Sequence, residues 1–377
     1  MASVLFSPFA LRGLTLRNRI VVSPMCQNSA ADGLPTPWHA MHLGSLAVSG
    51  AGLLIVEATA VEADGRITID DLGLYNDEQE HALARLVADI RSYSDMPLGL
   101  QLGHAGRKAS TRSPNDGRFR TLVLEPEDGA WQTWGPSPLA FGDGWPVPQA
   151  LDEAGLARIR DAYAQATRCA ARIGFDLLEL HGAHGYLLSQ FLSPLVNRRD
   201  DEYGGSLENR MRFPLQCLAA VRAAWPAHKP VGVRINGSDF TDGGLTPDEA
   251  VVYARALQAH GADYVTTSAG MVTPQSRFPR VEPGYLLPLA APLREAGIVT
   301  MGVGMILTPQ QAESAVAEGR ADLLALARAL LDDPRWVWHA AEALGEPPPI
   351  PHRYYYSHPR KWPGYRIVHA PAAEAVS

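Results

Sequence analysis

Two histidines and a tyrosine directly follow an apolar run in the stretch LLELHGAHGYLLSQF, residues 177–191. His181 and His184 are three residues apart, and Tyr186 comes two residues later. Side chains of these types bind zinc, exchange protons with a substrate or donate hydrogen bonds to it, and they also occur as plain strand-end residues. Two histidines supply too few ligands for a catalytic zinc, which needs three, so a metal site is the less favoured interpretation.

Residues with binding chemistry also stand after other short apolar runs. Gly304 and the pair Ala327-Arg328 could hold a phosphate, because backbone N–H groups and a guanidinium both bind phosphate oxygens. An amide such as Gln101 suits the edge of a pyrimidine ring, and a buried cation such as Arg234 would stabilise negative charge on it. This combination matches the needs of flavin mononucleotide (FMN).

The elements that position these residues follow a repeated pattern of helix, glycine and apolar strand. It is seen in GAGLLIVEA, GFDLLELHG, GADYVTTSA and GRADLLALA. A glycine suits the end of a helix, and an apolar run without alternation indicates a strand of a parallel sheet that is covered on both faces. Strands are expected to begin near Ile20, Leu53, Leu98, Leu177, Val231, Tyr264, Val299 and Leu323, and helices are expected near 77–92, 152–173, 206–224, 247–259, 309–318 and 335–344.

Eight strands that alternate with helices predict an α/β protein with a (β/α)₈ TIM barrel, formed by one domain over residues 1–345. An open doubly wound sheet is the alternative, and it is disfavoured because no G-x-G-x-x-G follows the first strand. The candidate residues then share the C-terminal end of the barrel, where barrels carry out their chemistry. The Gly-, Pro- and Trp-rich region 103–148 is expected to form an inserted lid after the third strand.

The composition narrows the class of protein. The net charge of -7 argues against a partner that is a nucleic acid, and no apolar stretch is long enough for a membrane span. Cys26, Cys169 and Cys217 are too scattered for a disulfide or metal pattern, and no signal-peptide pattern begins the chain. We therefore expect a cytoplasmic protein without a metal ion.

Several longer motifs resemble the Old Yellow Enzyme family, in its thermophilic-like, xenobiotic-reductase branch. The most specific is SPLVNRRDDEYGGSLENRMRF, residues 193–213, and SPMCQ, EATAVEADGRI, QLGHAGRKA, HGAHGYLLSQFLSP and VGVRIN are also similar. The resemblance implies a barrel with non-covalent FMN. It further implies that the flavin contacts Ser23, Pro24, Met25, Cys26, Ala58, Gln101, Arg234, Ala327 and Arg328.

The same resemblance assigns roles around the substrate. It implies that His181 and His184 hold the substrate oxygen and that Tyr186 occupies the proton-donor position. Two residues depart from the family pattern: Asn28 stands where the branch has a substrate-contacting Tyr, and Ala327 replaces a Gly beside the phosphate. Ala327 keeps the N–H that a phosphate needs, whereas Asn28 leaves the substrate preference open.

The activity implied is that of an ene-reductase. NADPH or NADH would reduce FMN, and the flavin would then reduce the activated C=C bond of an enone, enal, maleimide or nitro compound in a ping-pong reaction. A dienoyl-CoA-reductase-like relative would need an iron–sulfur cluster, which three scattered cysteines do not support. A non-catalytic flavin-binding barrel remains the other alternative, and the His–His–Tyr set argues against it.

The C-terminal segment, residues 346–377, is Pro-rich and then aromatic and basic. We expect an intersubunit arm in a homodimer or homotetramer. The resemblance implies that one side chain of the arm enters the neighbouring site, and Tyr356, Arg360 and Trp362 are the candidates.

Overall fold

Eight parallel strands form a closed barrel in the computed structural model, which describes residues 2–115, 117 and 123–365. In order around the barrel they are β3 (Ile20–Val22), β4 (Leu53–Ala60), β5 (Leu98–Gly103), β8 (Leu177–Gly182), β9 (Val231–Asn236), β10 (Tyr264–Ser268), β11 (Thr300–Gly302) and β12 (Leu323–Leu326). β12 pairs with β3 and closes the ring. The expected barrel is confirmed, and the open sheet is wrong.

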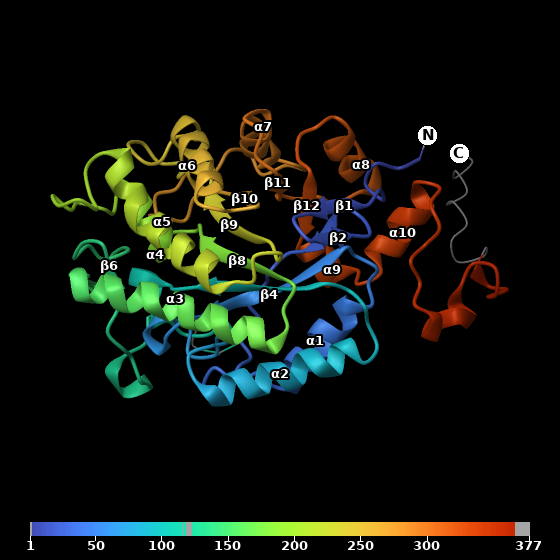
Figure 1. Ribbon diagram of the computed structural model, residues 1–377, viewed down its shortest axis with the longest axis horizontal. Coiled ribbons are helices and arrows are strands. Elements are labelled where there is room, and N and C mark those ends of the chain that lie inside the picture. Colours follow the sequence, from blue (N-terminus) through green and yellow to red (C-terminus); the bar gives the residue numbers. More distant parts are fainter. Residues whose placement is uncertain (1, 116, 118–122, 366–377) are drawn as a thin grey trace.

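Helices alternate with these strands and surround the barrel (Figure 1). The six expected helices are present as α2 (Asp77–Arg91), α3 (Glu153–Ile173), α5 (Leu207–Ala224), α6 (Pro247–Ala259), α8 (Pro309–Ala317) and α10 (Trp336–Ala343). All of these except α10 begin with a side-chain N-cap. In α3, the Asp152 side chain accepts a hydrogen bond from Gly155 N, and Gly174 ends the helix with a φ of 95°.

Four helices were not expected from the sequence: α1 (Pro37–Ala47), α4 (Leu187–Leu192), α7 (Leu287–Glu295) and α9 (Arg328–Asp332). α7 contains Pro292 within its span, and α1 buries His39 and His42 on its inner face. A proline inside a helix and polar residues on its buried face both hide the apolar periodicity that sequence analysis depends on. The other two helices are too short to show a period.

Apolar side chains fill both the barrel interior and the layer between the strands and the helices. The interior is built from alternate strand residues, such as Leu53, Leu177, Tyr264 and Leu323. Gly232 makes room for Tyr264, since a Cβ at this position would lie 2.3 Å from the tyrosine ring. An N-terminal hairpin of β1 (Phe9–Leu11) and β2 (Leu14–Leu16) adds Leu11 and Leu16 to the interior cluster. The hairpin packs at one end of the barrel interior, and the polar residues that follow the strands lie at the opposite end.

The region after β5 is tightly packed where it begins. It contains the short helices η2 (Gly106–Lys108) and η3 (Pro126–Asp128), and its later strand β6 (Trp134–Gly135) pairs with β7 (Gln149–Ala150). Arg107 is buried and donates to the carbonyls of Leu139, Ala140 and Val272. The role of residues 103–148 as a lid stays a prediction, and residues 116 and 118–122 within this region lie outside the described residues.

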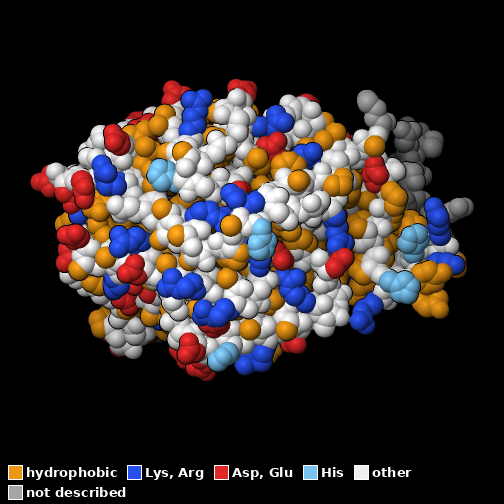
Figure 2. Space-filling model, viewed as in Figure 1, with side chains coloured by type: hydrophobic (Ala, Val, Ile, Leu, Met, Phe, Trp, Pro, Cys, Tyr) orange, Lys and Arg blue, Asp and Glu red, His pale blue; other side chains and the backbone are white. Residues whose placement is uncertain are grey.

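The C-terminal segment is described up to residue 365 and contacts α10 through Tyr354. Its helix η4 (His352–Ser357) places the Tyr354 ring 6.0 Å from the Trp338 ring. Hydrophobic side chains gather on the surface at this end of the molecule (Figure 2), and Tyr356 is 85% exposed. The expected intersubunit arm stays a prediction, and residues 366–377 lie outside the described residues.

No helix in the described part of the chain combines the length and the apolar character that a membrane span requires.

Candidate active site

A cleft of about 460 Å³ opens among the C-terminal ends of the strands. It is lined by six of the residues expected to bind cofactor or substrate: Ser23, His184, Arg234, Gly304, Ala327 and Arg328. These residues come from the ends of five different strands and from the loops that follow them. The folding of the barrel therefore brings the proposed phosphate residues and the proposed ring-binding cation into one cavity.

Arg234 provides a test of whether this cleft suits a flavin. Its Nη1 donates to Ser23 Oγ at 3.2 Å, whereas its buried Nε has no hydrogen-bond partner. Burial lowers the pKa of the guanidinium, and Glu179 raises it again. A buried donor of a cation calls for an acceptor, and the carbonyl and ring nitrogens of a flavin edge provide one. The residues present therefore fit FMN.

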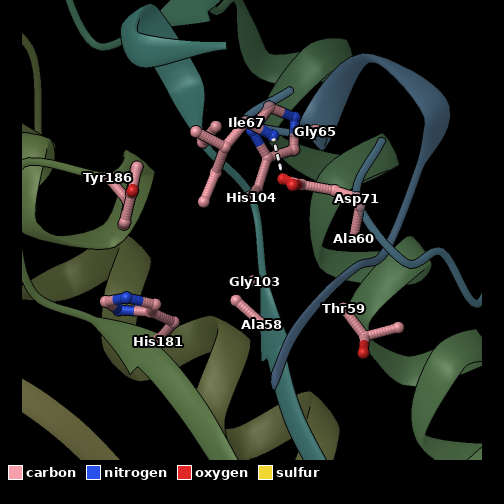
Figure 3. A pocket seen from close by; sticks show the side chains of 11 residues that line it. Ala58, Thr59, Ala60, Gly65, Ile67, Asp71, Gly103, His104, His181 and Tyr186 are labelled. Carbon is pink, nitrogen blue, oxygen red and sulfur yellow. Dashed lines mark hydrogen bonds between the residues drawn. The ribbon is translucent and has the colours of Figure 1, made fainter. Parts of the chain in front are cut away.

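A smaller cavity adjoins this site and is lined by three more of the expected residues, Ala58, His181 and Tyr186. Figure 3 shows His181 and Tyr186 on one side of this cavity, and His104, Ile67 and Asp71 across from them. The His181 and His184 rings lie edge to face with centroids 5.0 Å apart. Because His184 lines the larger cleft and His181 the smaller cavity, the histidine pair stands where the two meet.

The two histidines point one nitrogen each toward the same place. His184 Nδ1 and His181 Nε2 form a hydrogen bond of 3.3 Å, in which one nitrogen donates and the other accepts. Ala183 N–H donates to His181 Nδ1 at 3.3 Å, so the neutral His181 ring carries its proton on Nε2. Burial, together with Arg234, lowers the pKa of both rings well below the usual value. Both imidazoles are therefore neutral at physiological pH.

The backbone of His184 is held in an uncommon conformation. Its φ is 58°, in the left-handed region, and its N–H donates to Asn236 Oδ1 at 3.0 Å. Asn236 is fully buried, and its Nδ2 donates to Asp239 Oδ1 and to Gly270 O. Asn236 was missed as a site residue, although it ends the VGVRIN motif. Its role depends on a contact between the end of β9 and the turn after β8, which the sequence does not display.

Lys108 connects the histidine turn with Tyr186. Its Nζ donates to His184 O at 2.7 Å and to Met271 O at 3.1 Å, and it lies 5.0 Å from the centre of the Tyr186 ring. Burial, with a smaller contribution from Arg107, lowers the pKa of Lys108 to about 7. Burial raises the pKa of Tyr186 above its usual value. The phenol of Tyr186 therefore keeps its proton at neutral pH.

Asn28, the departure from the family pattern, is fixed by a carboxylate. Its φ is 48°, and its Nδ2 donates to Asp71 Oδ1 at 3.1 Å and to Thr68 Oγ1 at 3.3 Å. Asp71 also accepts from Ile67 N and Thr68 N. Burial raises the pKa of Asp71 to about 6. The amide of Asn28 is thus held by the loop that lines the smaller cavity.

Five expected residues line neither of these two cavities: Pro24, Met25, Cys26, Asn28 and Gln101. The Cys26 side chain is accessible, yet it lies among enough protein atoms that desolvation, followed by Asp71 and Glu57, raises its pKa. Gln101 is buried inside the barrel, where its Nε2 donates to Glu179. The contacts of these five residues with a flavin or a substrate stay predictions.

Within the described residues, no group of three or more His, Cys, Asp or Glu side chains is arranged to hold a metal ion.

Comparisons with known proteins identify the family of the chain. The model of a protein family described as "NADH:flavin oxidoreductase / NADH oxidase family" matches residues 4–346 of the chain. An NADPH dehydrogenase of Geobacillus sp. (strain WCH70) is 42% identical over 348 residues, which are 92% of this chain and 96% of that protein. An NADPH dehydrogenase of Listeria monocytogenes serovar 1/2a is 39% identical over 355 residues, 93% of this chain and 98% of that protein.

Solved structures show the same architecture. Morphinone reductase is 27% identical with a TM-score of 0.73, and the match covers 92% of this chain and 91% of that one. A 2-naphthoyl-CoA reductase has a TM-score of 0.80 at 23% identity, and the match covers 91% of this chain and 52% of that one. At this identity the likeness shows the fold alone. The chain belongs to the NADH:flavin oxidoreductase / NADH oxidase family, that of Old Yellow Enzyme, and is an NAD(P)H-dependent oxidoreductase with FMN as its cofactor.

Proposed function

We propose that the protein is an ene-reductase, which uses NADPH or NADH to reduce the activated C=C bond of α,β-unsaturated ketones, aldehydes, maleimides and nitro compounds. The observation that carries this proposal is the convergence of His181 Nε2 and His184 Nδ1, 3.3 Å apart, beside Tyr186. One of these two nitrogens accepts from the other here, and a single electron-rich oxygen, such as the carbonyl or nitro oxygen of these substrates, would accept from both N–H groups in place of that bond.

The residues of the larger cleft would hold the cofactor. Gly304, Ala327 and Arg328 lie where the phosphate would bind, and Ser23 and Arg234 lie where the ring would bind. The chemistry that FMN supplies when bound is hydride transfer, accepted from the nicotinamide in one half-reaction and delivered to the substrate in the other. The side chains around it position the substrate and handle the proton.

The histidine pair would bind the substrate oxygen and polarise the C=C bond. Negative charge develops on that oxygen when the β-carbon receives a hydride, and hydrogen-bond donors that are already in position stabilise it. Because burial keeps the pKa of both rings low, the pair donates two hydrogen bonds and brings no net charge. Asn236 contributes by holding the His184 turn in place.

Tyr186 would provide the proton for the α-carbon. Its raised pKa keeps the phenol protonated, and its ring centroid lies 4.8 Å from that of His181, next to the proposed oxygen site. When the phenol gives up its proton, the phenolate ring would lie 5.0 Å from Lys108 Nζ, which carries a positive charge whenever this group is protonated. A cation in this place lowers the cost of the transfer, and solvent then restores the proton.

The activity can be tested by a reaction that depends on both substrates. Protein loaded with FMN is expected to oxidise NADPH rapidly only when cyclohexenone is present and to form cyclohexanone, identified by gas chromatography. Cyclohexanone in place of cyclohexenone is the matched control, because it has the carbonyl but no C=C bond. FMN-loaded protein that forms no cyclohexanone, and reduces no maleimide or nitroalkene either, contradicts the proposal.

A further inference from the structure

A carboxylate lies inside the barrel, below the cleft. Glu179 is the third residue of β8, between Leu177, an interior residue, and His181 of the active site, and its side chain is 0% exposed. Alternate residues of a strand face the same side of the sheet, so Glu179 faces the barrel interior together with His181. A fully buried carboxylate costs free energy unless it is bound by donors and balanced by a positive charge.

Donors from two other strands meet this carboxylate. Gln101 of β5 lies directly opposite Glu179 in the sheet, and its Nε2 donates to Glu179 Oε1 at 2.7 Å. Thr266 of β10 donates through Oγ1 to Glu179 Oε2. Both oxygens of the carboxylate are therefore occupied by donors, an arrangement that favours the ionised form. The amide of Gln101 is fixed by the same contact.

The balancing positive charge is that of Arg234. In the register of the sheet, Glu179 pairs with Gly232 of β9 and His181 pairs with Arg234, so Glu179 and Arg234 are diagonal neighbours. Burial raises the pKa of Glu179, and Arg234 makes the largest of the contributions that oppose this rise. Arg234 lines the cleft, whereas Glu179 lies one layer deeper. The negative charge of the carboxylate therefore affects the electrostatic potential in the cleft, with the guanidinium of Arg234 between the two.

We propose that Glu179 is a positioning residue of the flavin site, which fixes the Gln101 amide and offsets the charge of Arg234, and thereby limits how much more tightly the site binds reduced than oxidised flavin. This inference rests on the proposed function only in placing the flavin ring beside Arg234. Its physical basis is charge. A reduced flavin ring carries an additional negative charge, which Arg234 attracts and Glu179 repels, and water does not screen either effect inside the barrel.

The test is the variant Glu179→Gln, which keeps the size and the oxygen acceptor of the side chain but removes its charge. The ratio of the dissociation constants of oxidised and reduced FMN is expected to rise at least tenfold. For a two-electron couple, this change equals a rise of about 30 mV in the midpoint potential. The potential is measured by anaerobic titration against a reference dye, and the dissociation constant of oxidised FMN by fluorescence.

The matched control is Thr266→Val, which removes one hydrogen bond to the same carboxylate and leaves its charge. This variant is expected to keep the wild-type ratio within about twofold, even if it unfolds at a lower temperature. If Glu179→Gln does not fold, Glu179→Leu replaces it, because an apolar side chain suits the barrel interior and also removes the charge. The same rise in the ratio is expected for it.

An unchanged ratio in a charge-removing variant that binds FMN overturns the proposal, because Glu179 would then be neutral or purely structural. A rise of the same size in Thr266→Val also overturns it, because hydrogen bonding or packing would then explain the effect. A wild-type protein that binds FMN but reduces no enone contradicts the proposed function and leaves this measurement intact. The two proposals therefore fail separately.

Discussion

The hydroxyl oxygen of Ser268 lies 2.6 Å from Nε2 of His184, on the opposite side of the imidazole from the nitrogen that faces His181. A hydroxyl both donates and accepts hydrogen bonds. When it donates to Nε2, the neutral His184 ring carries its proton on Nδ1 and can donate to a substrate oxygen; when it accepts from Nε2, His184 Nδ1 accepts from His181 instead. We therefore expect Ser268, at the end of β10, to set whether His184 is a donor to the substrate.

Ser268→Ala is expected to weaken substrate reduction. Without the hydroxyl, the donor tautomer of His184 leaves Nε2 buried without a partner, which costs about 1–3 kcal/mol. The kcat/KM for cyclohexenone should fall about tenfold to hundredfold, while FMN binding stays near that of the wild type. Ser268→Thr restores a hydroxyl and should recover most of the loss. Equal kinetics in Ser268→Ala and the wild type would show that this contact does not set the tautomer.

His181→Ala and His184→Ala are expected to be more severe. Loss of one donor to a developing oxyanion costs about 3–4 kcal/mol, or a factor of about 10²–10³ in the rate of substrate reduction. The rate at which NADPH reduces the bound flavin should change less, because no negative charge develops on an enone oxygen in that step. Stopped-flow measurement of both half-reactions checks this. Wild-type rates of enone reduction in both variants would refute the role of the histidine pair.

Lys108 should leave a signature in the dependence of stability on pH. Its pKa in the folded protein is about 7, below the ordinary value near 10 in the unfolded chain. Between these two values the unfolded chain binds the additional proton, so stability rises with pH and falls as the pH decreases toward 7. Relative to Lys108→Met, the wild type is expected to gain about 1 kcal/mol per pH unit between roughly pH 7.5 and 9.5.

Urea unfolding of both proteins at several pH values measures this difference. His181, His184, Arg107 and Tyr186 also face this region, and both proteins contain them, so their contributions largely cancel. A stability difference that does not depend on pH would mean that Lys108 titrates near its ordinary value.

The exposed aromatic residues of the C-terminal segment predict an assembly. Tyr355 and Tyr356 are 41% and 85% exposed, and side chains of this kind are typical anchors of an interface. The full-length protein is expected to be at least a dimer. Deletion of residues 352–377 should raise the KM for cyclohexenone more than the dissociation constant of FMN. Light scattering and steady-state kinetics test both points, and a truncated protein with unchanged assembly and KM would contradict them.

The sequence predicted most of the fold because the barrel repeats one local pattern. The apolar runs beginning at Leu53 and Leu177 could be predicted as strands from their own residues, because each run has apolar side chains on both faces. The same logic placed His181 and Arg234 at the active end, since each stands at the end of its run. The helix α7 was missed because Pro292 interrupts the local pattern that the prediction uses.

Glu179, Asn236 and Ser268 were not predicted for a different reason. Each acts through a residue on or just after another strand, namely Gln101 of β5 or His184 in the turn after β8. Such contacts depend on the register between strands, which depends on the whole barrel rather than on neighbours in the sequence. A buried Glu within the apolar run LLELHG was the one local sign, because an ionisable residue inside a strand needs a partner.

An anaerobic experiment in two stages tests the central claim most directly. Purified protein loaded with FMN is first mixed with one equivalent of NADPH and then with cyclohexenone, while the flavin absorbance near 450 nm is recorded. The account predicts that NADPH bleaches the flavin and that cyclohexenone restores the absorbance with formation of one equivalent of cyclohexanone, slowed at least a hundredfold in His184→Ala. Flavin that is bleached by NADPH but remains reduced in the presence of cyclohexenone, maleimide and nitroalkene would contradict it.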